Sequence, residues 1–196
     1  MKLEPAVLAD VAQKATESSS RALSLLVGEE VTVKTTQASY LSLDKLADLV
    51  THQEGMNVVA FSQLMSGIKG AALLIMGHDD ALHLVDALLQ KPLGTTKVLG
   101  DMEKSAIKET LNILSNSQIT SLTKNLGVTI NVMPPNLITQ EHVASVLDYL
   151  AAQQGEEAEV VAFETSLVTT GQACQVTMFI VFDAELANII AQQEQA

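Results

Sequence analysis

The 196-residue sequence is poor in basic residues and cysteine and has no long apolar run. Lys and Arg number 11 against 23 Asp and Glu, and the net charge of −12 argues against nucleic acid and anionic membranes as partners. Cys174, the only cysteine, has no partner for an internal disulfide. No segment approaches the roughly 20 apolar residues of a membrane span, and the N-terminus does not resemble a signal peptide. A soluble, cytoplasmic protein is therefore expected.

Apolar residues make up 47% of the chain and follow clear helical and strand-like patterns. Residues spaced three and four apart predict helices over 4–27, 43–50, 78–89, 101–126, 141–154 and 183–193. Alternating or β-branched runs predict strands over 31–36, 57–65, 71–76, 128–136, 158–168 and 173–182. Gly28 and Gly127 mark the ends of the two longest helices.

The same order of elements, helix-strand-helix-strand-strand-helix, occurs twice along the chain. The tetrapeptide VVAF appears at Val58–Phe61 and again at Val160–Phe163, 102 residues later. This pattern predicts internal repeats over about residues 1–95 and 96–196, related by a pseudo-two-fold axis within a single domain over 1–196. The predicted fold is α+β, with one mostly antiparallel sheet and long helices packed on it. Two independent domains divided near Gly94 are the alternative.

The predicted helix over 101–126 carries a line of three polar residues, Ser105, Glu109 and Asn112. At about 100° per residue, they fall within a narrow stripe of the helix surface. The opposite side of the helix carries Ile107, Leu111, Leu114 and Leu122. A carboxylate beside a neutral amide suits hydrolysis by positioning, of which phosphoryl transfer is the main example. The alternative is the ordinary solvated face of an amphipathic helix.

This polar line resembles the signature of the CheC, CheX and FliY type of chemotaxis phosphatase. That signature is Asp or Ser, three residues, Glu, two residues, Asn, then 22 residues and a Pro. Ser105, Glu109, Asn112 and Pro135 match it at all four positions. The duplicated architecture and the length also resemble CheC, so the resemblance covers nearly the whole chain.

The resemblance implies a phosphatase that hydrolyses the aspartyl-phosphate of a CheY-like response regulator in two-component signalling. By analogy, Asn112 orients the attacking water in the regulator's active site, and Glu109 contacts a lysine of the regulator. Ser105 would support the helix or the interface, and Pro135 would shape the adjacent loop. The regulator would supply Mg²⁺, so neither a cofactor nor a metal site is expected in this chain.

The first half departs from the family pattern, because CheC and FliY carry the signature twice. A shift of 99 residues places Asp10 opposite Glu109 and Gln13 opposite Asn112. Asp10 is one methylene too short and Gln13 one too long for a mechanism that depends on positioning. We therefore expect a degenerate, inactive first site, or simply two residues on a solvated helix face.

The alternative function is a non-catalytic binding module, similar to the middle domain of FliM. Such a module would bind a response regulator, a flagellar switch component or a CheD-like partner without hydrolysis. The sequence leaves open whether the chain is a monomer or a homodimer. Asp79, Asp80 and His83 are interpreted as helix N-terminal residues rather than a metal site, and Cys174 as a core residue.

Overall fold

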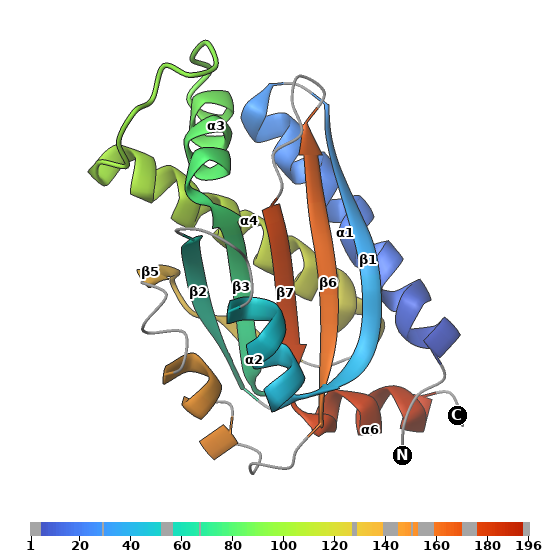
Figure 1. The fold of residues 1–196 in the computed structure, drawn as a ribbon. Helices are drawn as coiled ribbons and strands as arrows, with labels where there is room; N and C mark the ends of the chain where they lie inside the picture. The colour runs from blue at the N-terminus through green and yellow to red at the C-terminus, as the bar shows by residue number, and fades with distance from the viewer. Residues whose placement is uncertain are drawn as a thin grey trace.

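The computed structural model describes residues 5–28, 30–51, 57–66, 68–126, 129–138, 145–149, 151–152, 159–169 and 176–193 (Figure 1). Its helices are α1 (Pro5–Val27), α2 (Leu43–Thr51), α3 (His78–Leu88), α4 (Asp101–Leu126) and α6 (Ala184–Gln193). Its strands are β1 (Val31–Ser42), β2 (Asn57–Met65), β3 (Gly70–Gly77), β4 (Asn131–Val132), β5 (Asn136–Ile138), β6 (Glu159–Thr169) and β7 (Val176–Phe182). The fold is α+β, as predicted.

One antiparallel sheet contains strands from both halves of the sequence. Its order is β1-β6-β7-β3-β2-β4, and β5 also pairs with β2. At its centre β3 pairs with β7, with Gly70 opposite Phe182. The outer strands cross between the halves, since β1 pairs with β6 while β4 and β5 pair with β2. Each half therefore completes the sheet of the other.

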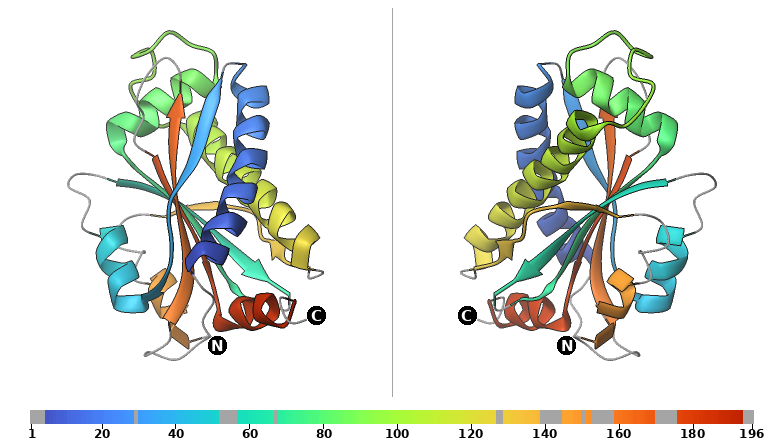
Figure 2. Two further views of the ribbon diagram at one scale, coloured as in Figure 1. Left: turned by 90° about the vertical axis from the view of Figure 1, so that its right-hand side faces the viewer. Right: turned by 90° about the vertical axis from the view of Figure 1, so that its left-hand side faces the viewer.

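Helices cover both faces of this sheet (Figure 2). Successive strand residues point to opposite faces, so Leu74 lies in the core beneath α1, α3 and α4, while Ile75 lies in a second core. The second core also contains Leu46 of α2 and Val146 of the helical residues 145–149. Because both faces of β3 are covered, that strand is apolar along nearly its whole length.

The stretch predicted as a strand over 128–136 differs in the structure. It contains two short strands, β4 and β5, with Pro134 and Pro135 between them. Proline has no N–H to donate to a neighbouring strand, so the ladder is interrupted at this point.

Other predicted boundaries changed or fall partly outside the described residues. The strand predicted over 31–36 continues to Ser42 through a register shift between Thr35 and Gln37. Of the helix predicted over 141–154, residues 145–149 and 151–152 are described and helical. The helix end predicted at Gly127 and the core position predicted for Cys174 lie outside the described residues.

Helix α1 ends where the sequence predicted, and its serines hold the neighbouring strand. Gly28 has a φ of +80°, and its N–H donates to the Ser24 carbonyl at 3.0 Å, which is a typical glycine stop. The Val31 N–H donates to the Ser24 hydroxyl at 2.9 Å, and the Val33 N–H to the Ser20 hydroxyl at 2.8 Å. Side chains of α1 thus satisfy two N–H groups of β1, the strand at one edge of the sheet.

Candidate functional site on helix α4

Helix α4 turns one side to the core and presents the polar line on the other. Ile107, Leu111 and Leu114 are fully buried, as the helical periodicity predicted. Ser105 and Glu109 are exposed, and Asn112 is half-buried. Leu122 was also predicted to be buried, but its side chain is not among those that the structure describes.

The N-terminal end of α4 is fixed by the connector that follows α3. Asp86, a buried residue of α3, accepts hydrogen bonds from the main-chain N–H groups of Thr95 at 3.0 Å and Thr96 at 2.9 Å. Lys91 forms an ion pair with Glu103, in the first turn of α4, at 3.5 Å. These contacts tie the connector to the helices on both sides of it.

Burial acts to raise the pKa of Asp86, but its hydrogen bonds from the connector outweigh burial and hold that pKa below the ordinary value. Asp86 is therefore a carboxylate at neutral pH. Because the connector leads directly into α4, this buried anion helps to set where the polar line begins.

Glu109 and Asn112 lie in contact on the outer face of α4. The Asn112 Nδ2 donates to Glu109 Oε2 at 3.4 Å. The structure thus brings a carboxylate and an amide together at one point of the surface. Ser105 lies one turn earlier, where its hydroxyl donates to the Asp101 carbonyl at 2.8 Å. In this structure the Ser105 hydroxyl therefore supports the helix backbone.

Asn116 continues the polar line by one further turn, and it was not identified from the sequence. It is exposed, and its Nδ2 donates to both the main-chain oxygen and Oδ1 of Asn112, each at 2.8 Å. The signal that reveals it is the spacing of four residues after Asn112, which places both side chains on the same face.

Pro135 lies in the segment between β4 and β5 and is half-buried. This segment is held against β2, because the Met133 N–H donates to the Gln63 carbonyl at 2.9 Å. The Ser62 hydroxyl in turn donates to the Met133 carbonyl. Helix α4 packs against both β4 and β5, which places the segment that carries Pro135 beside the helix.

The corresponding region of the first half lies on α1, which packs along α4. The hydroxyls of Ser18 and Ser117 meet at 2.9 Å, and these two residues are 99 positions apart, the same shift that pairs Gln13 with Asn112. Asp10 and Gln13 are both exposed. Asp10 forms an ion pair with Lys14 at 2.8 Å, so its carboxylate already has a cationic neighbour.

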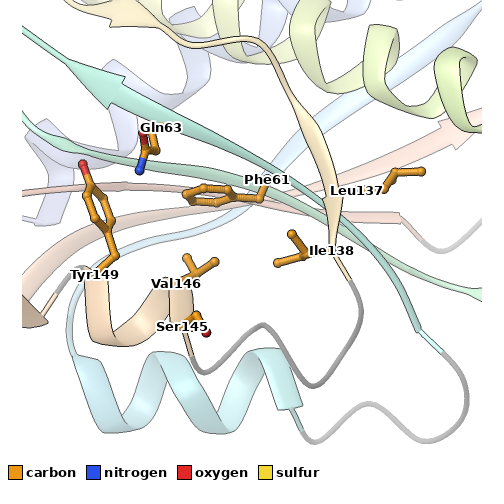
Figure 3. A pocket seen from close by; sticks show the side chains of 7 residues that line it. All are labelled: Phe61, Gln63, Leu137, Ile138, Ser145, Val146 and Tyr149. Carbon is orange, nitrogen blue, oxygen red and sulfur yellow. The ribbon is translucent and has the colours of Figure 1, made fainter.

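A separate hollow of about 420 Å³ lies on the other face of the sheet (Figure 3). Phe61 of β2 and Ile138 of β5 line it, together with Val146 and Tyr149 of the helical residues 145–149. All four side chains belong to, or pack against, the core beneath α2 rather than the core beneath α4. The hollow is therefore not part of the polar line.

No three His, Cys, Asp or Glu side chains lie close enough to hold a metal ion in the part of the chain that the structure describes. Nor does any helix described there have an apolar stretch long enough to cross a membrane.

Comparison with known proteins gives relatives in sequence and in structure. The flagellar motor switch phosphatase FliY of Bacillus subtilis strain 168 is 26% identical over 121 residues. This match covers 61% of the present chain but only 31% of that protein. The crystal structure of Thermotoga maritima FliY has a TM-score of 0.76 at 20% identity and covers 98% of this chain and 97% of its own. In sequence the chain is similar to part of a FliY protein, and it has the fold of the CheC, CheX and FliY proteins.

Two further structures extend the comparison within this fold. CheX of Borrelia burgdorferi, solved as a complex with CheY, BeF₃ and Mg²⁺, has a TM-score of 0.55 at 18% identity, with coverage of 89% of this chain and 99% of its own. The middle domain of FliM from Vibrio alginolyticus has a TM-score of 0.65 at 12% identity, with coverage of 96% of this chain and 99% of its own. At such identities these likenesses show the fold. No protein-family profile matches the chain.

Proposed function

We propose that this chain hydrolyses the aspartyl-phosphate of a CheY-like response regulator. The observation that carries the proposal is the contact between Glu109 and Asn112 on the outer face of α4. Two likenesses support it: a sequence relative is named a phosphatase, and a protein of the same fold has been solved bound to CheY with BeF₃ and Mg²⁺.

The chemistry requires that a water molecule attack phosphorus in line with the bond to the aspartyl oxygen. The new P–O bond forms as the old one breaks, the aspartate carboxylate leaves, and the water's proton passes to phosphate or solvent. Most of the catalysis in such a step is alignment and charge stabilisation. An amide is suited to alignment, because it donates and accepts hydrogen bonds without being a base.

Asn112 is the residue that would orient this water, with Glu109 beside it as the docking group. The Glu109 carboxylate is exposed and acceptor-only, so it fits a lysine of the regulator. Its bond to Asn112, at 3.4 Å, is long enough to be exchanged for a stronger charge-assisted contact. The Mg²⁺ that stabilises the phosphoryl group would come with the regulator.

The test is the rate of phosphate loss from a phosphorylated CheY-like regulator in the presence of Mg²⁺. Wild type should accelerate the loss. Asn112→Ala should lower kcat by about 100-fold, the scale of a misplaced reacting group. Glu109→Ala should mainly raise KM. Gln13→Ala, the matched position on α1, should leave both constants within about twofold of wild type.

The alternative is a binding module without hydrolysis, which the likeness to the FliM middle domain favours. It predicts that wild type binds the regulator but leaves its phosphate loss unchanged. Titration with a regulator carrying BeF₃ and Mg²⁺ measures the binding separately from the chemistry, so the two functions give different results.

A further inference from the structure

Asn116 forms a paired contact with the amide proposed to orient water. Its two Nδ2 hydrogens have two acceptors, the main-chain oxygen of Asn112 and Oδ1 of Asn112, each at 2.8 Å. Side chains on a helix lean toward its N-terminus, so a residue at 116 naturally reaches back over Asn112. The same lean carries Asn112 toward Glu109, which accepts from its Nδ2 at 3.4 Å.

The three side chains form a chain of contacts in which the orientation of each amide is determined. A carboxylate only accepts hydrogen bonds, so Asn112 must turn Nδ2 toward Glu109 and Oδ1 toward Asn116. A main-chain carbonyl also only accepts, so Asn116 must present Nδ2 to Asn112. Reversing the Asn112 amide would place its oxygen against the Glu109 carboxylate. Reversing the Asn116 amide would place its oxygen against the two Asn112 oxygens.

We infer that Asn116 is a positioning residue that holds the Asn112 amide in the orientation needed for hydrolysis. This inference rests on the proposed function. Asn116 occupies one lone pair of Oδ1 and Glu109 one hydrogen of Nδ2, which leaves Asn112 one acceptor and one donor for a water. When Glu109 turns to a lysine of the regulator, Asn116 remains to hold the amide. The contact between Asn116 and Asn112 is therefore most important in the complex with the regulator.

The kinetic test separates positioning from docking. Asn116→Ala should lower kcat for phosphate loss by about tenfold and leave KM within about twofold, because the residue acts on Asn112 rather than on the regulator. Asn116→Asp keeps the size but replaces the two donors with acceptors, so it should lower kcat further. Asn188→Ala is the matched control, since Asn188 is an exposed helical residue that donates to Glu185 at 3.3 Å.

A second measurement does not depend on activity. Side-chain ¹⁵N relaxation of Asn112 Nδ2 should show a lower order parameter in Asn116→Ala than in wild type, with no such change in Asn188→Ala. If wild type does not hydrolyse the regulator, the proposed function is wrong whatever the relaxation data show. If wild type is active but Asn116→Ala keeps its kcat, or loses kcat while Asn112 stays equally ordered, the inference about Asn116 is overturned.

Discussion

Replacing Asp86 should destabilise the protein beyond the helix that carries it. Its carboxylate accepts the N–H groups of Thr95 and Thr96, whereas an amide would accept one and turn its own NH₂ toward the other. We expect Asp86→Asn to lower the free energy of unfolding by about 3 kcal/mol, because a buried donor loses its acceptor. Urea denaturation measures this change. Asp79→Asn, an exposed position in the same helix, should cost less than about 1 kcal/mol.

The pH dependence of this contribution follows from the direction of the pKa shift. The pKa of Asp86 in the folded protein lies below 3.8, its ordinary value. Its stabilising effect is therefore fully present above that value and is lost as pH falls through the folded pKa. The difference in unfolding free energy between wild type and Asp86→Asn should be constant between about pH 5 and 8 and shrink below 3.8. A difference that grew with acid would contradict the assigned hydrogen bonds.

At the residue scale, the sequence predicted what depends on periodicity alone. The burial of Ile107, Leu111 and Leu114, and the outward line that includes Glu109, follow from the helical repeat. The role of Asp86 could not be predicted in this way. Its partners lie nine and ten residues away in an irregular connector, whose path no repeat specifies.

At the scale of the element, the stripe on the outer face of α4 extends beyond the three predicted residues. Met102 lies on the same stripe, three residues before Ser105, and is 65% exposed. If the regulator docks along this stripe, the thioether is buried in the complex. Met102→Gln should then raise KM by about tenfold and leave kcat unchanged, since burying a Met side chain contributes on the order of 1.5–3 kcal/mol.

Met65→Gln provides the control for this prediction, because Met65 is an exposed methionine of β2, off the stripe. Titration calorimetry with a regulator carrying BeF₃ would check the affinity directly. An unchanged KM in Met102→Gln would show that docking ends before the first turn of α4. A change in kcat would instead point to a disturbed helix.

The elements themselves were predicted more completely than the contacts between them. The Asn57–Met65 strand and the Asp101–Leu126 helix have the predicted bounds, because each is a long and regular pattern. The Ser18 hydroxyl of α1 meets the Ser117 hydroxyl of α4, a contact between residues that are 99 positions apart in the sequence. That Ser20 and Ser24 bind β1 depends on tertiary packing, which local pattern does not encode.

At the scale of the whole molecule, the shared sheet determines how the protein should unfold. The β3–β7 pair joins strands from the two halves, and Gly70 lies at one end of it opposite Phe182. A Cβ at Gly70 would lie 2.0 Å from the Val181 main-chain oxygen, far inside van der Waals contact. The strong repetition in the sequence indicated two similar halves, but only the pairing shows that their outer strands are exchanged.

Gly70→Ala should therefore weaken the entire fold rather than one half. The clashing oxygen belongs to the backbone of β7 and moves only if the central pair separates, so we expect a loss of about 3 kcal/mol or more in unfolding free energy. Gly77→Ala, at the other end of β3, meets only the Asp80 carboxylate at 3.6 Å and should cost less than about 1 kcal/mol. Circular dichroism in urea should show one transition in all three proteins. Two separate transitions in Gly70→Ala would mean that each half folds without the other.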